Sequence, residues 1–232
     1  MNYFSLRFDP EAMGIYPQAV GITEIYDIRM PNSFQNAATN NLLQQLLIPS
    51  KIHIKHNSKW TDRLSIGSIS HPYLIISAKM LSVIQSVRTP NYYLYPVSVT
   101  KGQKTREYYI FVMEDQFIHY INLQTCMATL IQKSSPDVTP VDLIQATFTS
   151  HEDFLTQKSS LNPYSYFRIT HFEMNPSAIE YDVFRLAQEV SAPASYFVSE
   201  NFVTAADKAN LTGIKFEPFP QEINSLYNLV EY

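Results

Sequence analysis

The chain is poor in the residues on which several common active sites depend. Its 232 residues include only five glycines and a single cysteine, Cys126. So few glycines leave few backbone positions that can wrap a phosphate, and no two have the spacing of a P-loop or a dinucleotide fingerprint. A lone cysteine excludes an intramolecular disulfide, which fits a reducing compartment. We therefore expect neither a nucleotide cradle nor a disulfide framework.

Charge is also scarce, and its balance is mildly acidic. Charged residues make up 16% of the chain and the net charge is −4. A general nucleic-acid binder carries a basic footprint, so we expect no nucleic-acid partner. No apolar run approaches the ~18 residues that a membrane-spanning helix needs, and residues 1–10 lack a signal-peptide pattern. These features predict a cytoplasmic protein without a membrane partner. One basic stretch, over residues 51–63, is interpreted as a solvated strand or loop face.

A strand–helix–strand pattern occurs twice, 122 positions apart. The copies cover residues 74–97 and 196–219 and align without a gap. In each copy a short apolar run ends at a serine, Ser77 or Ser199, which can cap the helix that follows. A second apolar run then ends near a proline. Only two of the 24 aligned positions are identical. Internal duplication and chance similarity between two common units therefore both stay open.

Other patterns complete the prediction of an α+β fold with mixed sheets flanked by helices. Apolar residues at every fourth position predict a helix over residues 33–48, and short helices are expected over 142–146 and from Ser150. Strands are expected where apolar residues alternate or cluster, over 3–8, 22–30, 51–55, 108–113, 117–123, 127–131, 166–174 and 181–186. The three strands from 108 to 131 are expected to form an antiparallel meander, and the last two to pair with each other.

The stretch 134–140 holds two prolines and is the best place for an internal boundary. It divides the chain into an N-terminal half, 1–133, with the helix 33–48 and the first unit, and a C-terminal half, 134–232, with the second unit. We expect these halves to be two lobes of one compact domain. Gly213 is expected to be the left-handed residue that closes the second helix.

The sequence contains no recognisable catalytic or metal-binding motif. Residues 67–70 lack the second glycine of a nucleophile elbow. Leu155 stands where the helix of a zinc protease needs its second histidine. Cys126 lies in an apolar run and is expected to be a buried, inert thiol. We therefore expect no catalytic residue, no bound metal and no cofactor.

The second unit resembles the C-terminal signature of immunity proteins of bacterial polymorphic toxin systems. The run Phe184-Arg185-Leu186 precedes Val198-Ser199-Glu200, and the unit closes on residues 211–218, Leu-Thr-Gly-Ile-Lys-Phe-Glu-Pro. Immunity families eleven and forty-three are the most similar. Residues 74–77 and 92–96, before the strand at 108–113, are similar to the central portion of these families. The pattern spans roughly residues 60–220 and is sharp only over 181–218.

The resemblance implies a non-enzymatic protein that binds one cognate toxin and blocks it. Such a protein needs a preformed face with aromatic anchors. Tyrosines that cluster on predicted strands are the candidate contacts, namely Tyr92, Tyr93, Tyr95, Tyr108, Tyr109, Tyr164 and Tyr166. The alternative for each cluster is that one tyrosine belongs to the core and its neighbour to ordinary surface. The sequence does not determine the toxin or the oligomeric state.

Two other functions remain open from the residues alone. The first is an enzyme of unrecognised class, with a site built from His119, His151 or His171 and nearby carboxylates. A deep pocket with converging polar groups and a shifted histidine pKa would favour it. The second is an interaction domain of a secretion apparatus, which a pull-down returning only secretion components would favour.

Overall fold

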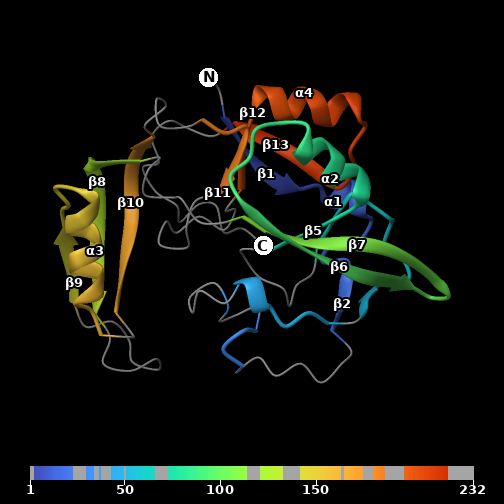
Figure 1. Cartoon of the computed structure of the whole chain (residues 1–232), viewed down its shortest axis with the longest axis horizontal. Helices are drawn as coiled ribbons and strands as arrows, with labels where there is room; N and C mark the ends of the chain where they lie inside the picture. Colours follow the sequence, from blue (N-terminus) through green and yellow to red (C-terminus); the bar gives the residue numbers. More distant parts are fainter. Residues whose placement is uncertain are drawn as a thin grey trace.

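The computed structural model describes residues 3–22, 30–33, 37, 43–49, 51–65, 73–113, 121–132, 142–162, 165–174, 180–185 and 196–218. Within these ranges the protein has an α+β fold, with strands in three sheets and with helices packed against them (Figure 1). The fold class expected from the sequence is thus confirmed.

The largest sheet has six strands in the order β2-β3-β6-β7-β5-β4. Its one parallel pair is β3 with β6, and its other pairs are antiparallel. The strands are β2 (Ala19–Ile22), β3 (Lys51–Ile54), β4 (Arg63–Leu64), β5 (Leu74–Ile76), β6 (Tyr92–Lys101) and β7 (Lys104–Met113). Strands β6 and β7 form a long hairpin whose tip extends beyond the rest of the sheet, at the right of Figure 1.

A second sheet has four strands in the order β11-β12-β1-β13, all antiparallel to their neighbours. These strands are β1 (Tyr3–Phe8), β11 (Val183–Arg185), β12 (Tyr196–Ser199) and β13 (Ile214–Pro218). Strand β1 comes from the start of the described chain, yet it lies between two strands from the other end. The first strand and the last unit therefore depend on each other for their hydrogen bonds.

The four-stranded sheet repeats the order of four strands in the larger sheet. In both, a short strand is followed by the first strand of a strand–helix–strand unit, a central antiparallel strand, and the last strand of that unit. The equivalent strands are β4 and β11, β5 and β12, β7 and β1, and β6 and β13. The central strand follows its unit along the chain in one case and comes from the N-terminal segment in the other.

The strand registers obey the same offset of 122 residues as the sequence pattern. Each central strand has one residue between a residue of the first strand and a residue of the last. The two sets are Ile110 between Ile75 and Tyr95, and Ser5 between Phe197 and Glu217. Both flanking residues in the second set stand 122 positions after their counterparts. The similarity thus extends from local pattern to tertiary pairing.

Along the chain, the helix of each unit comes between the two strands of that unit. These helices are α2 (Ala78–Gln85) and α4 (Glu200–Lys208), and the hydroxyl of Ser77 or Ser199 accepts a hydrogen bond from an amide of the first turn, as expected. The two helices pack against each other and cover one shared core (Figure 1). Apolar side chains from both sheets and from the helices fill this core, including Leu6, Phe111 and Tyr196 from strands and Phe202 from α4.

Two buried aspartates join the units crosswise. Asp182, just before β11, accepts hydrogen bonds from Ser199 Oγ at 2.7 Å and from the backbone amide of Arg88 at 3.1 Å. Ser199 caps the helix of the same unit, whereas Arg88 follows the helix of the other unit. Asp62, just before β4, binds Ser77 Oγ at 2.7 Å and the amide of Thr212 at 2.9 Å in the same way. Each carboxylate therefore fixes one helix start and the segment after the other helix.

A third sheet, with the order β10-β8-β9, forms a separate group of elements at the left of Figure 1. Its strands are β8 (Ile121–Gln132), β9 (Asp142–Ala146) and β10 (Tyr166–Met174), and helix α3 (His151–Ser159) packs on it. Three phenylalanines whose ring centroids lie 5.0–5.9 Å apart, Phe148, Phe154 and Phe167, form the contact between helix and sheet.

Several predictions in this region are wrong. Residues 142–146 form strand β9 and not a helix, because five residues are too few for a stable helix and pairing with β8 satisfies their backbone groups. The two strands expected over 117–123 and 127–131 meet in the single strand β8, which pairs with β10 and β9 and does not continue a meander after β7. The strand at 181–186 pairs with β12 and not with β10.

The other expectations for helices have mixed outcomes. Helix α1 (Pro10–Met13) lies in a segment where no helix was expected. Of the expected helix 33–48 the structure describes residues 33, 37 and 43–48, and the helical element among these residues is the short 3-10 helix η1 (Leu43–Gln45). Asn210, with φ 49°, and not Gly213, is the left-handed residue next to the C-cap of α4. The boundary expected at 134–140 lies outside the described residues.

Replacing Asp182 by asparagine is expected to lower the free energy of unfolding by about 2–4 kcal/mol. The substitution removes a buried charged acceptor from Ser199 and Arg88 and leaves an amide group facing their donors. Urea unfolding monitored by circular dichroism measures the change. Asp207→Asn, on the exposed side of α4, is the matched control and should change stability by less than about 0.5 kcal/mol. Equal effects of the two substitutions would contradict the role given to Asp182.

The Asp182 carboxylate also makes the free energy of unfolding depend on pH. Burial raises the pKa of Asp182, but hydrogen bonds from Ser199, Arg88 and Asn201 outweigh burial and leave the pKa below its usual value. Its stabilising contribution is therefore complete above the unfolded-state pKa of about 3.9 and is lost as the pH falls through the lower folded-state pKa. The stability difference between the wild type and Asp182→Asn should shrink when urea midpoints are measured at pH 3 and below. A difference that stays constant from pH 7 to pH 2 would contradict this.

Candidate functional site

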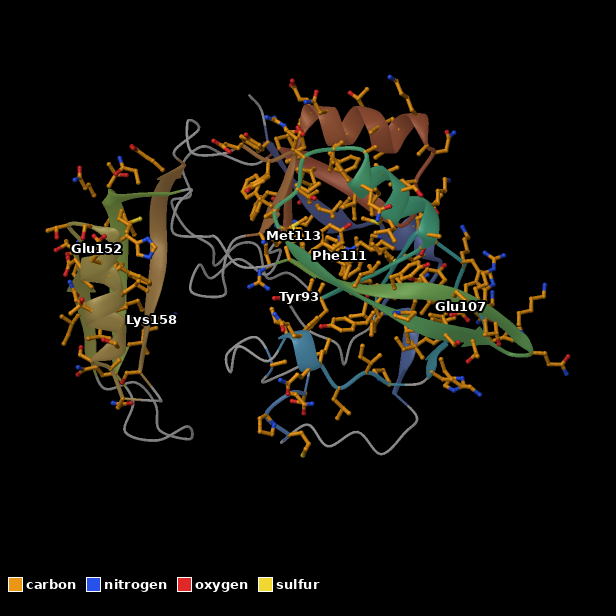
Figure 2. All side chains as sticks on the ribbon, viewed as in Figure 1. Tyr93, Glu107, Phe111, Met113, Glu152 and Lys158 are labelled. Atoms are coloured by element: carbon orange, nitrogen blue, oxygen red, sulfur yellow. The ribbon has the colours of Figure 1, made fainter. Side chains whose placement is uncertain are left out.

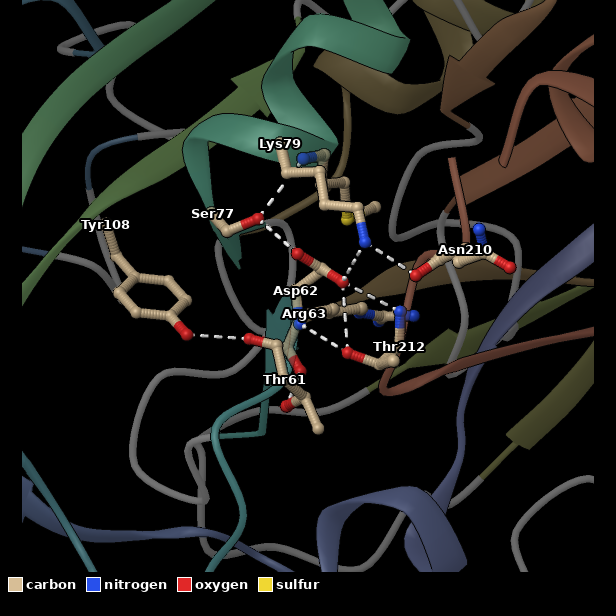
Figure 3. A network of polar contacts seen from close by, with 9 residues as sticks. Thr61, Asp62, Arg63, Ser77, Lys79, Tyr108, Asn210 and Thr212 are labelled. Atoms are coloured by element: carbon tan, nitrogen blue, oxygen red, sulfur yellow. Dashed lines mark hydrogen bonds and ion pairs between the residues drawn. The ribbon is translucent and has the colours of Figure 1, made fainter. Parts of the chain in front are cut away.

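The Asp62 carboxylate lies at the centre of a polar network where the two units meet (Figure 3). Oδ2 accepts hydrogen bonds from the amide and hydroxyl of Thr212 at 2.9 and 3.0 Å, and it forms an ion pair with Lys79 Nζ at 3.6 Å. Oδ1 accepts from Ser77 Oγ at 2.7 Å. Lys79 also donates to the backbone carbonyl of Asn210 at 2.6 Å. Residues from both strand–helix–strand units thus meet on one carboxylate.

Above this network lies an open pocket of about 390 Å³. Strand β5 pairs with β7 only as far as Tyr109, so the continuing edge of β7 borders the pocket where β5 has ended. The pocket is lined by Trp60, Thr61, Asp62, Ser77, Ala78, Lys79, Arg106, Glu107, Tyr108 and Thr212. Because Thr212 belongs to the second unit and residues 77–79 to the first, this pocket depends on the junction of the two units.

Trp60 forms one wall of the pocket and is the only tryptophan of the chain. Its ring is partly exposed and stacks on Tyr108, with ring centroids 6.2 Å apart and an angle of 19° between the planes. The Arg106 guanidinium lies 4.7 Å from the centroid of the Trp60 ring. The Tyr108 hydroxyl donates to the carbonyl of Thr61 at 2.7 Å, and burial raises its pKa to about 12. Tyr108 therefore remains neutral and holds Trp60 in place.

The polar groups of the pocket floor are already engaged within the fold. The Ser77 hydroxyl donates to Asp62 and accepts from the amide of Met80, so it serves as a helix cap. Both oxygens of Asp62 accept hydrogen bonds. Besides the exposed carboxylate of Glu107, the pocket therefore offers a ligand an aromatic ring and cations, which suits binding more than bond chemistry.

The structure distributes the tyrosines nominated from the sequence over different faces. Tyr93 and Tyr95 pack on one face of the six-stranded sheet, whereas Tyr92 and Tyr109 pack on the opposite face. Tyr108 is buried, with 3% of its surface exposed. Tyr166 lies in β10 of the separate three-stranded sheet, and Tyr164 lies outside the described residues. Among the described tyrosines of this group, Tyr108 alone borders the pocket, so they do not form one common surface.

Figure 2 shows the side chains of the three-stranded sheet group apart from those around β7. Phe111 and Met113 point into the body beside β7, whereas Glu107 lies farther along the hairpin toward its tip. Glu152 and Lys158 lie on α3, at the left of the view. Tyr95 donates its hydroxyl to the carbonyl of Leu43, and burial raises its pKa. The tyrosines of β6 are thus used mainly to hold neighbouring segments.

The histidines of the enzyme alternative are also separated. His151 is the first residue of α3, His171 lies in β10, and His119 lies outside the described residues. In the part of the chain that the structure describes, no group of three or more histidine, cysteine, aspartate or glutamate residues could hold a metal ion. Cys126 is buried as expected, and burial together with the nearby Glu173 raises its pKa to about 12. Its thiol therefore stays protonated at neutral pH.

Apart from Tyr108, sequence reasoning did not nominate the residues that form this pocket as contacts. Trp60 and Arg106 are far apart in the chain and belong to no motif, and only the folded hairpin brings them together.

Arg63 was assigned to a solvated basic stretch, but it is 3% exposed, donates to the carbonyl of Leu6 at 2.9 Å and stacks on Phe8. Burial lowers its pKa to about 9. For the pocket, the single tryptophan, Trp60, was the one signal available in the sequence, since tryptophan residues often anchor interfaces.

Comparison with known proteins adds no assignment to this site. No family model matches the sequence, and no curated protein matches it. Among the described residues, no helix is both long enough and apolar enough to cross a membrane.

Replacing Gly213 by alanine is expected to destabilise the protein by about 2–4 kcal/mol. Gly213 has φ 80°, and a Cβ there would lie 2.6 Å from the carbonyl oxygen of Arg63 and 2.7 Å from Cβ of Thr61. Both the left-handed backbone and the clash oppose alanine. Gly102→Ala is the matched control, since Gly102 has φ 57° but nothing within 4 Å. The control should cost about 1–2 kcal/mol. Urea unfolding tests this, and equal losses would contradict the close approach at Gly213.

Proposed function

We propose that this protein is a non-enzymatic immunity protein that binds and blocks a cognate bacterial toxin in the cytoplasm. The observation that carries the proposal is the pocket at the junction of the two units. It presents Trp60 and Arg106 outward, while its polar floor is held by internal hydrogen bonds. Tryptophan, tyrosine and arginine are the residues that most often dominate the energy of protein interfaces.

The segment that resembles immunity families supports this function in a second way. Residues 181–218 contribute β11, β12, α4 and β13, and the signature serine Ser199 caps α4 and binds Asp182. The residues of the signature thus stabilise the fold, which fits a family whose members share a scaffold. In such a family the surface is free to change with each toxin, and the inhibitor acts by covering the active site of its target.

A rigid scaffold also suits the mechanism. Slow release of a toxin requires a preformed surface, because ordering a flexible one on binding would reduce affinity. Trp60 is held by stacking on Tyr108, whose hydroxyl is anchored to Thr61, and by the nearby guanidinium of Arg106. The proposed anchor is therefore already in its bound arrangement before the toxin arrives.

Co-expression with the protein encoded beside this gene tests the proposal. Cells that make the neighbouring protein should lose viability, and co-expression of the wild type should restore growth. Trp60→Ala should weaken the complex about tenfold or more, measured with a catalytically inactive form of the neighbour, because it removes an interface anchor. Tyr16→Ala removes an aromatic residue that is 50% exposed elsewhere and should bind as the wild type does.

Two results would overturn the proposed function. One is a neighbour that is harmless when made alone and does not bind this protein. The other is turnover of a small compound by the purified protein that disappears when His151 or a carboxylate is replaced. In the second case the enzyme alternative would take the place of the immunity function.

A further inference from the structure

Positive charge is concentrated at one end of the six-stranded sheet. Residues 51–59 and 98–107 contain six lysine and arginine residues but only one carboxylate, Glu107, although the whole chain has a net charge of −4. The six cations are Lys51, Lys55, Lys59, Lys101, Lys104 and Arg106. The rest of the protein is therefore distinctly acidic, and the charge is distributed asymmetrically.

Tertiary pairing brings the two segments together. Strand β3 lies parallel to β6, with Lys51 beside Ser98 and His53 beside Thr100. Beyond the strands, Lys101 Nζ donates to the carbonyl of Ser58. The turn that follows β3 therefore lies against the base of the hairpin tip. We call this group of six cations and Trp60 the basic end.

The register of the hairpin shows that three of the cations share a face with Trp60. Lys101 pairs with Lys104, and Arg106 pairs with Val99. Side chains of directly paired residues point to the same face, and alternate residues of a strand share that face. Lys104 and Arg106 therefore lie on the same face as Tyr108, on which Trp60 stacks. Glu107 lies on the opposite face, where it accepts a hydrogen bond from Ser98.

The cations of the basic end have no carboxylate partner within the described part of the chain. The ion pairs found there join Arg7 and Lys215 to Glu217, Lys79 to Asp62, and Arg88 to Asp182. Lys59, Lys104 and Arg106 are exposed. An uncompensated group of like charges around a fixed aromatic ring attracts an oppositely charged surface and offers it an anchor.

We propose that the basic end is a docking surface for an acidic face of a partner protein, with Trp60 as the central anchor. This rests on the proposed function and names the chemistry of the toxin surface that it would cover. A protein fits better than a nucleic acid, because the remaining surface is acidic and would repel an extended polyanion beyond this short group of cations. The pocket of about 390 Å³ beside Trp60 has room for a side chain of that partner.

The test reverses charge at two places and compares association rates. Lys104→Glu/Arg106→Glu changes the basic end, whereas Lys158→Glu/Lys208→Glu changes exposed cations on α3 and α4. Both double variants lower the net charge of −4 by the same four charges, so general charge effects are matched. The probe is the catalytically inactive neighbouring gene product, with binding followed by surface plasmon resonance at several salt concentrations and by emission of Trp60.

The wild type should associate more slowly as salt rises, and binding should change the emission of Trp60. The variant Lys104→Glu/Arg106→Glu should associate about tenfold or more slowly at low salt, while Lys158→Glu/Lys208→Glu should associate within about twofold of the wild type. Lys59→Glu/Lys104→Glu leaves the stacking of Arg106 on Trp60 intact and should give the same slow association. Circular dichroism confirms that each variant is folded.

The outcomes separate this proposal from the proposed function. If the wild type protects cells and binds, but variants of the basic end associate as fast as the control pair, the docking surface is wrong and the immunity function stands. If the wild type does not bind the neighbour, both are overturned. The remaining outcome is a labelled single-stranded DNA or RNA oligonucleotide that binds the wild type tightly and loses binding on Lys104→Glu/Arg106→Glu. That result would overturn the acidic protein as the partner of the basic end and identify a nucleic acid in its place.

Discussion

The architecture depends on two buried carboxylates, Asp62 and Asp182. Each binds the serine that caps the helix of its own unit and the backbone amide that follows the helix of the other unit. In each case the amide of the aspartate itself donates back, to the carbonyl of Thr212 or Arg88. A carboxylate is suited to this position because one charged group accepts several hydrogen bonds, and each is stronger than a bond between neutral groups. The same contact joins the two units twice.

The candidate site is a consequence of this junction. The segment after α4 reaches Asp62 only because Gly213 allows a close approach to the backbone of Arg63 and to Thr61. That approach places Thr212 beside Lys79 and closes one side of the pocket in front of Trp60. The basic hairpin of β6 and β7 then supplies Arg106 from the other side. Stability and the proposed binding surface therefore share residues, so substitutions in the network are expected to affect both.

Local patterns in the sequence were sufficient where a segment contained its own apolar spacing or capping residue. The serine caps of α2 and α4, the strands of both units and the strand at residues 3–8 all followed from apolar spacing and a capping residue. The prediction failed at residues 142–146, because a short apolar run fits a helix or a strand and the partner strand decides between them. The strand at 108–113 formed as part of β7, but the meander expected over 108–131 was wrong, because a strand's own sequence does not specify which strand it pairs with.

By itself the sequence determined the α+β class, the two similar units and the resemblance that motivates the proposed function, since these depend on residue spacing within short segments. Only the tertiary structure decided that β1 completes the sheet of the last unit, and that Asp62 and Asp182 join the units crosswise. It also decided that Trp60 meets Arg106 beside a group of lysines. The reason is physical: these contacts form between residues far apart in the chain, and burial and pairing, not local preference, bring them together.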